Sequence, residues 1–159
     1  DVGTISSLWE ANMEVLDPEH SGIDVFDENW KVYSRNSGMT GHRILGDAVV
    51  ENSLITDGCC IEGNVKNSVL FAGVKVEPGA VVEEAVVMGG TVIKAGAVVK
   101  HCIVAENCEI GEGAVVGAMP VADEKAVAHI GYGIKIGAGA KVGPNATVRN
   151  DVKEGEEQC

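Results

Sequence analysis

Large aliphatic side chains recur at a nearly constant interval along most of the chain. From Leu70 to Val116 they follow one another at steps of five or six residues, and from Ile130 to Val148 at steps of six. A small or β-branched residue usually stands two positions earlier. This spacing lacks the i, i+3, i+4, i+7 pattern of an amphipathic α-helix, and glycine and valine are too frequent for one. It therefore predicts short β-strands joined by tight corners.

A short motif within this pattern occurs four times, and its last three copies begin 17 residues apart. A fixed short period is typical of a solenoid, in which three runs of about six residues form one triangular coil. Residues one period apart then stack in columns, about 4.8 Å apart along the axis. An ordinary β-sandwich is the alternative, but sandwich strands do not keep such a register for three periods. The copies are Val50-Glu-Asn-Ser-Leu-Ile55, Val65-Lys-Asn-Ser-Val-Leu70, Val82-Glu-Glu-Ala-Val-Val87 and Val99-Lys-His-Cys-Ile-Val104. The predicted interior columns are Leu70, Val87 and Val104; Val76, Ile93 and Ile110; and Val82, Val99 and Val116.

Two segments match a known repeat closely. Ile110-Gly-Glu-Gly-Ala-Val-Val116 and Ile136-Gly-Ala-Gly-Ala-Lys-Val142 resemble the hexapeptide repeat of left-handed parallel β-helices. The left hand is implied by this resemblance and not by the spacing. We therefore expect an all-β fold, a left-handed parallel β-helix built from hexapeptide repeats and preceded by a short helix and a linker.

The chain divides into segments around this β-helix. Residues 1–17 are expected to form a helix, and residues 18–43 an irregular connector. The β-helix is expected over residues 44–150, with a loop at 117–129 that leaves one corner. Residues 151–159 form an acidic tail that we expect to be frayed.

The first helix has a recognisable start and an apolar face. Ser7-Leu-Trp-Glu10 resembles a capping box, and Asp17-Pro18 ends the helix. We expect this helix to cover the first coil at one end, and we expect a strand at Trp30–Tyr33 in the connector. The apolar face consists of Leu8, Trp9, Met13 and Leu16.

Composition narrows the function. Acidic residues number 24 against 12 basic ones, which gives a net charge of -12. This balance argues against binding to nucleic acid or to an anionic membrane surface. We find neither an apolar run of membrane-spanning length nor a secretory signal, and we expect a cytoplasmic protein.

The five cysteines do not have metal-ligand spacing. Cys59 and Cys60 are adjacent, and no Cys-x-x-Cys motif occurs. Cys59, Cys102 and Cys108 occupy the small-residue position of the repeat, so we expect them to be buried spacers and not zinc ligands or disulfide partners.

Three segments before the repeats carry a more specific resemblance. They are Asp1-Val-Gly-Thr-Ile5, Leu8-Trp-Glu-Ala-Asn-Met-Glu-Val-Leu16 and Lys31-Val-Tyr-Ser34. Their order, followed by the repeats, resembles the C-terminal third of bacterial glucose-1-phosphate adenylyltransferase (ADP-glucose pyrophosphorylase). The stretch Ser37–Arg43 departs from the family, whose members often carry a Pro-Pro segment there.

The resemblance implies a role in bacterial glycogen synthesis. In this family an N-terminal nucleotidyltransferase domain converts ATP and glucose 1-phosphate into ADP-glucose and pyrophosphate. The chain starts without a methionine and lacks the family's Gly-rich nucleotide loop. We therefore expect a fragment that is inactive by itself, with residues 1–17 as the last helix of the absent domain. Its expected role is oligomerisation and regulation within a tetramer, built from one kind of subunit or with a paralogous one.

The resemblance also implies site residues. Asp1 matches the aspartate of the Asp-x-Gly-Thr motif, which helps to hold Mg²⁺ in the full-length enzyme; we expect no catalytic residue and no cofactor in the fragment. Sugar phosphates activate many family members, and phosphate binding needs basic donors. The candidates are Lys31, Arg35, His42 and Arg43, although a solvated basic connector explains them more simply.

Three rival functions share the fold or the family. A coenzyme A-dependent acyltransferase needs a histidine base, for which His101 and His129 are candidates, although each is more simply an exposed corner residue. A zinc carbonic anhydrase needs three converging histidines, and His20, His42, His101 and His129 are poorly spaced for that. A regulatory paralogue of the adenylyltransferase, without catalysis, is the third.

Overall fold

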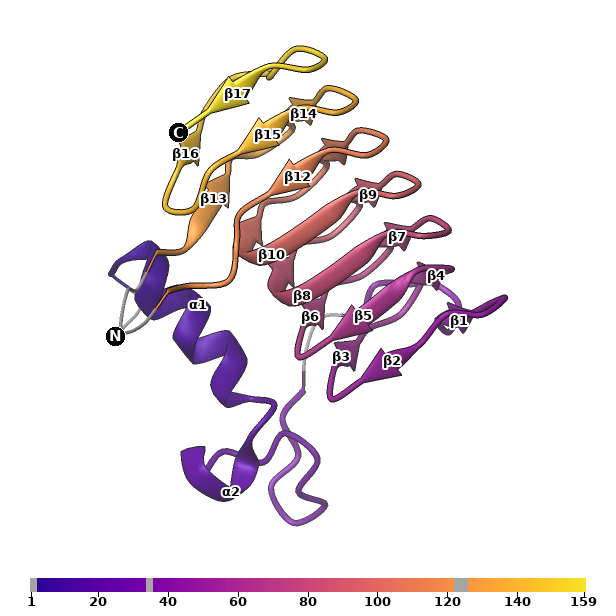
Figure 1. Cartoon of the computed structure of the whole chain (residues 1–159). Helices are drawn as coiled ribbons and strands as arrows, with labels where there is room; N and C mark the ends of the chain where they lie inside the picture. Colours follow the sequence, from indigo (N-terminus) through magenta and orange to yellow (C-terminus); the bar gives the residue numbers. More distant parts are fainter. Residues whose placement is uncertain (1–2, 34–35, 122–125) are drawn as a thin grey trace.

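The protein is a parallel β-helix of stacked coils with one helix along its side (Figure 1). The structure is a computed structural model, and it describes residues 3–33, 36–121 and 126–159. The expected fold class is confirmed. The elements are α1 (Ile5–Glu14), α2 (Pro18–Ser21), β1 (Arg43–Ile44), β2 (Val50–Glu51), β3 (Leu54–Ile55), β4 (Cys60–Ile61), β5 (Asn64–Lys66), β6 (Val69–Leu70), β7 (Lys75–Val76), β8 (Val81–Val87), β9 (Val92–Ile93), β10 (Val98–Val104), β11 (Glu109–Ile110), β12 (Val115–Val116), β13 (Ala128–Ile130), β14 (Lys135–Ile136), β15 (Lys141–Val142), β16 (Thr147–Val148) and β17 (Glu157–Gln158).

The strands form three walls, and all their pairs are parallel. One wall follows the order β1-β4-β7-β9-β11-β14, and a second follows β2-β5-β8-β10-β12-β15-β17. The third joins β3 and β6 to the second halves of β8 and β10 and continues through β13 to β16. β8 and β10 each turn a corner and belong to two walls.

The interior columns agree with the predicted register. Leu70 pairs with Val87, which pairs with Val104, and the other two columns stack in the same way. These side chains are almost fully buried. Aliphatic residues of similar size fill each column because the cross-section of the prism repeats from coil to coil.

The acidic C-terminal segment is not frayed, contrary to the expectation for residues 151–159. Val152 forms a bridge with Ile136 and is 2% exposed. β17 pairs with β15, where Lys141 and Glu157 form an ion pair at 2.8 Å. A Cβ atom on Gly137 would meet the backbone of this segment. The segment is a further coil, in which only Val152 has to be apolar because the charged side chains face solvent.

The N-terminal part differs from expectation at two points. The helix is capped three residues earlier than predicted, because Thr4 is the N-cap and exchanges hydrogen bonds with Ser7 in a capping box. Trp30–Tyr33 forms no strand in the described connector, and Trp30 lies in a bend. Trp30 and Tyr33 are mostly exposed, so this segment lacks a neighbouring sheet edge with which to pair. In the described residues, neither helix is long and apolar enough to cross a membrane.

Candidate functional site

The outer face of the third wall carries an apolar surface that α1 covers. Successive residues of a strand point to opposite faces, so the residue before each interior aliphatic points outward. Val86 and Ile103 stand in these outward positions, in register with each other, yet both are almost completely buried. Together with Val127 they form a small second core against α1. Four residues of α1 and one residue after β8 pack on this second core: Ile5, Leu8, Trp9, Met13 and Met88.

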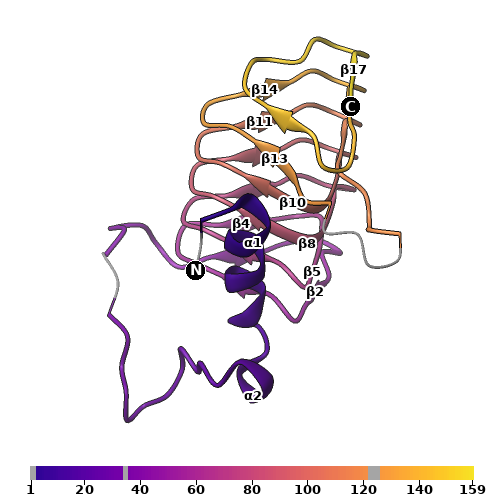
Figure 2. The ribbon, with the colours of Figure 1, turned by 90° about the vertical axis from the view of Figure 1, so that its left-hand side faces the viewer.

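The helix lies along the stack of coils and does not close its end. α1 contacts β8 and β10, which belong to successive coils. Figures 1 and 2 show α1 beside the coils with its axis along the stack, and α2 beyond it. Ten helical residues span about 15 Å, enough to pass about three coils. The expectation that this helix covers the first coil at one end is therefore wrong. The helix instead follows the outward apolar residues.

Next to α1, one corner of the β-helix has an unusual residue pattern. Asn52, Asn67, Glu84 and His101 occupy the same motif position in successive coils, with φ of 39, 45, 49 and 45°. Asparagine and histidine are enriched in this left-handed region, whereas glutamate is not. The first two residues are linked by an amide hydrogen bond of 3.1 Å. In the next two coils the carboxylate of Glu84 lies 3.0 Å from Nδ1 of His101.

Trp9 connects α1 to this corner. Its indole Nε1 donates a hydrogen bond of 2.8 Å to the main-chain carbonyl of Glu84. Its ring lies 4.3 Å from the imidazole of His101, with an angle of 48° between the planes. We call Trp9, Glu84 and His101 the corner joint. The expectation of an exposed corner for His101 is wrong: it is 5% exposed, because α1 covers the corner.

His129 continues the outward column beyond Ile103. The two residues pair between β10 and β13. His129 is half-buried, not the exposed corner residue that was expected, and its Nδ1 is buried without a hydrogen-bond partner in the described structure. Burial lowers the pKa of His129, and the nearby positive charge of Arg149 lowers it further.

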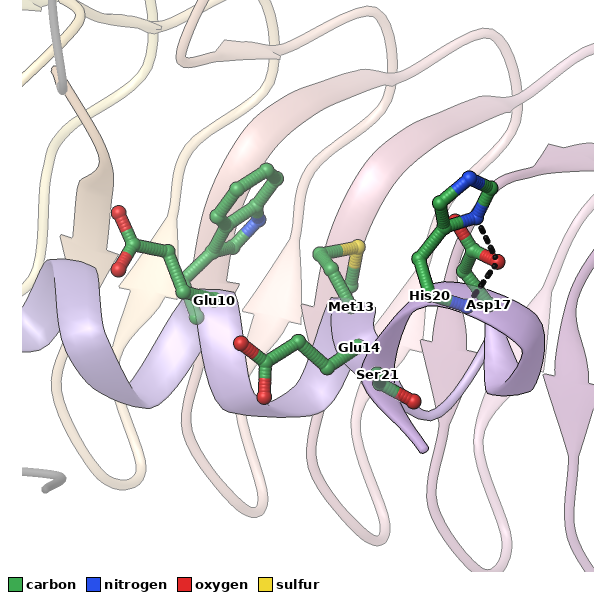
Figure 3. A pocket seen from close by; sticks show the side chains of 7 residues that line it. Glu10, Met13, Glu14, Asp17, His20 and Ser21 are labelled. Atoms are coloured by element: carbon green, nitrogen blue, oxygen red, sulfur yellow. Dashed lines mark hydrogen bonds and ion pairs between the residues drawn. The ribbon is translucent and has the colours of Figure 1, made fainter. Parts of the chain in front are cut away.

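A groove of about 410 Å³ runs between α1 and α2 (Figure 3). Figure 3 shows Glu10 and Glu14 extending from α1, and Asp17 facing His20. His20 Nδ1 lies 2.8 Å from the Asp17 carboxylate. This contact raises the pKa of His20 and lowers the pKa of Asp17. Since carboxylates line the groove, its negative charge would repel a phosphate. It is lined by Trp9, Glu10, Met13, Glu14, Asp17, His20 and Ser21.

The residues proposed for an effector are not brought together in the described structure. Lys31, His42 and Arg43 are exposed, and no hydrogen bond or ion pair joins their side chains within the described ranges. Arg35 and the predicted Mg²⁺ ligand Asp1 lie outside the described residues. The effector site and the Mg²⁺ ligand therefore stay predictions.

In the part of the chain that is described, the structure bears on one of the two acyltransferase candidates and on the zinc site. His101 is engaged by Glu84 and covered by Trp9, so it is not open to a coenzyme A substrate. Within residues 3–33, 36–121 and 126–159, no group of three His, Cys, Asp or Glu side chains could hold a metal ion. Cys59, Cys102 and Cys108 are buried in the core, as expected, and burial raises the pKa of Cys102 to about 12.

The sequence reasoning missed the outward column and the corner joint. A signal for the column was present in the apolar pairs Val86-Val87 and Ile103-Val104. Only the second residue of each pair belongs inside the coil, so the first requires a cover from outside. For the joint, the change from Asn52 and Asn67 to Glu84 and His101 was visible, but its partner Trp9 was not.

The comparisons with known proteins agree with this fold. The family model described as GlmU-like, C-terminal hexapeptide matches residues 41–136. Two Caulobacter crescentus structures resemble the chain at low identity. PerB in complex with CoA and GDP-perosamine is 21% identical with a TM-score of 0.50, over 73% of this chain and 52% of that one. A point mutant of GDP-perosamine N-acetyl transferase in complex with the same molecules is 20% identical with a TM-score of 0.52, over 75% and 53%. These two likenesses show the fold alone.

Curated relatives are more similar in sequence. Glucose-1-phosphate adenylyltransferase of Geobacillus stearothermophilus is 49% identical over 81 residues, which is 51% of this chain and 21% of that protein. The protein of the same name from Bacillus mycoides is 53% identical over 81 residues, with the same shares of each chain. The match thus spans about a fifth of the length of these relatives.

Proposed function

The chain belongs to the GlmU-like, C-terminal hexapeptide family, and from this premise we propose that it is the β-helix part of a glucose-1-phosphate adenylyltransferase. Its role is to assemble the subunits and to regulate them. The complete enzyme joins ATP and glucose 1-phosphate to give ADP-glucose and pyrophosphate for glycogen synthesis. The identity of about half of the aligned residues to curated adenylyltransferases is the observation that carries the proposal.

The chemistry assigns catalysis to a further domain. In this reaction a phosphate oxygen of glucose 1-phosphate attacks the α-phosphorus of ATP, the bond to the β-phosphate breaks, and pyrophosphate leaves. Such a transfer needs a phosphate cradle and usually a metal ion. The described walls offer aliphatic columns and paired surface charges in place of such a cradle. We therefore propose that residues 1–159 alone are inactive.

Mg²⁺ belongs to the proposed full-length enzyme. Asp1 is its proposed ligand, because a carboxylate oxygen suits this hard cation. When bound, the ion offsets the negative charge that is shared between the transferring phosphates. This role comes from the resemblance of Asp1-Val-Gly-Thr4 to the family motif, and it requires further ligands from the catalytic domain.

Regulation is proposed for the connector. Lys31, Arg35, His42 and Arg43 are basic residues of the connector in a chain with an excess of acidic residues, and a sugar-phosphate effector needs such donors. In the full-length enzyme, Arg35→Ala together with Arg43→Ala is expected to abolish activation by a sugar phosphate such as fructose 1,6-bisphosphate. Unchanged activation would exclude this site.

Assembly is proposed to yield a tetramer in the cytoplasm, from one kind of subunit or with a paralogous one. The first coil supports an interface, because Ile44 and Val49 are about half exposed beside strands without a partner on one side in the described chain. The free cysteines agree with a reducing compartment.

The test is an assay of a longer chain that includes the sequence preceding residue 1. Product formation from glucose 1-phosphate is measured with each nucleoside triphosphate, for the parent and for Asp1→Asn. ADP-glucose from ATP alone, lost in the variant, is the expected result. ADP-glucose synthesis by residues 1–159 would contradict the proposed inactivity. No product with any triphosphate would favour the regulatory paralogue.

A further inference from the structure

The corner beside α1 changes its residue types at the point where the helix arrives. The first two coils place Asn52 and Asn67 there, joined by a side-chain hydrogen bond. Asparagine suits this left-handed backbone, and its side-chain amide can form a hydrogen bond with the asparagine of the next coil. The same residue would therefore serve in the next two coils as well. The chain instead carries Glu84 and His101 at φ of 49 and 45°. A glutamate in this region is strained and persists where surrounding contacts hold it.

Glu84 and His101 are held by α1 and by each other. Both polar ends of Glu84 are used: its carbonyl accepts from the indole of Trp9 at 2.8 Å, and its carboxylate lies 3.0 Å from Nδ1 of His101. The carboxylate fixes the proton on Nδ1 and so holds the imidazole plane. The Trp9 ring packs against this imidazole, with the ring centroids 4.3 Å apart and the planes tilted by 48°. Each member of the corner joint thus orients the next.

From this arrangement we infer that Glu84 and His101 are positioning residues, which set the orientation of α1 on the β-helix. The apolar contacts of Val86 and Ile103 hold α1 against the wall, but they are non-directional. The hydrogen bond to the Glu84 carbonyl and the ring contact with His101 are directional, and they fix where along the wall the helix stops. If the proposed function holds, the joint also orients the domain that precedes α1.

The test replaces the joint by the residues of the coils below. In a Trp30→Phe background, Trp9 is the remaining tryptophan. The double variant Glu84→Asn with His101→Asn is expected to shift Trp9 emission to longer wavelength. Amide hydrogen exchange in α1 is expected to become at least about tenfold faster, since a directional contact is lost. The exchange rate in β8 is expected not to rise, and the thermal midpoint is expected not to fall, because asparagine suits this corner. Unchanged emission and unchanged exchange in α1 would overturn the inference.

A control and a second variant keep the test decisive. Asn145→Gly alters a left-handed residue between β15 and β16 and is expected to leave exchange in α1 unchanged. Trp9→Phe retains a ring for the contact with His101 but removes the donor to Glu84. It is expected to accelerate exchange in α1 severalfold, and no acceleration would refute the role of the hydrogen bond. Because residues 1–159 are used alone, failure here is distinct from failure of the proposed enzymatic role.

Discussion

Trp9 and Glu84 stand 75 residues apart in the sequence, yet a hydrogen bond of 2.8 Å joins the indole of one to the carbonyl of the other. The bond links the first helix to the middle of the coil stack. A solenoid coil normally contacts only the coils before and after it. The hydrogen bond is therefore a long-range contact that the repeat architecture does not require, and the residues around it give the clearest tests.

Ile103→Ala tests the outward apolar column. The side chain is 1% exposed and is covered by α1, so truncation leaves a cavity at the junction. We expect the free energy of unfolding to fall by about 2–4 kcal/mol in urea denaturation. Val121→Ala, at a site 79% exposed, is the control and is expected to change it by less than about 0.5 kcal/mol. Equal small losses for both variants would show that α1 does not bury this residue.

Two glycines with similar backbones separate conformational strain from steric overlap. Gly113 and Gly117 have φ of 62 and 70°, but only at Gly117 would a Cβ meet the backbone, at the Lys100 carbonyl. Gly113→Ala is expected to destabilise by about 1 kcal/mol, the cost of a left-handed alanine. Gly117→Ala is expected to lose at least twice as much. Thermal unfolding monitored by circular dichroism measures both, and equal losses would contradict the close approach.

His129 gives the protein an acid-sensitive site. Burial and Arg149 lower its pKa in the folded state, so below the ordinary value of about 6.5 the unfolded chain binds a proton that the folded chain does not. Stability is therefore lost as the pH falls below about 6.5. His129→Asn is expected to flatten the dependence of unfolding free energy on pH between 7.5 and 5.5. The exposed His42→Asn serves as control, and parallel profiles for His129→Asn and the parent would disprove the assignment.

The cysteines should differ sharply in reactivity. Burial raises the pKa of Cys102 to about 12 and also raises those of Cys59 and Cys108, so their thiolates are scarce and covered. Cys159 is exposed. With iodoacetamide at pH 8, mass spectrometry is expected to find Cys159 labelled in the native protein and Cys102 labelled only after unfolding. Early labelling of Cys102 would mean that the coil opens at that level.

The last coil can be tested by removing it. Deletion of residues 151–159 uncovers Ile136 and Val142, which pair with Val152 and Gln158. We expect the thermal midpoint to fall by several degrees, since a 1–2 kcal/mol loss produces a shift of that size. Lys141→Gln breaks an ion pair whose partners are both about two-thirds exposed, and it is expected to leave the midpoint unchanged. If the deletion leaves the thermal midpoint unchanged, residues 151–159 do not form a stabilising coil.

The sequence allowed the interior to be predicted, because the same kind of residue must recur wherever the same cross-section recurs. Val152 lies four residues after Val148, short of the six-residue step, and the surrounding glutamates suggested a frayed tail, although outward positions of a coil tolerate charge. The position of α1 was harder to predict. Val86 and Ile103 belong to one surface only after the coils have stacked, so the surface on which Trp9 and Leu8 pack is absent from any local window of sequence. The basic residues of the connector could be named from the chain, but the described structure does not assemble them into a site.

The direction of α1 has a mechanical consequence. Coils in a linear stack can peel away singly from either end, because each depends only on its neighbours. Because α1 lies parallel to the stack and contacts two successive coils, it acts as a splint. Neither coil can tilt or separate from the other without breaking its contacts with α1. Unfolding by force or heat should thus begin at the outer coils and pause at the splinted pair, so that the middle of the molecule is its most durable part.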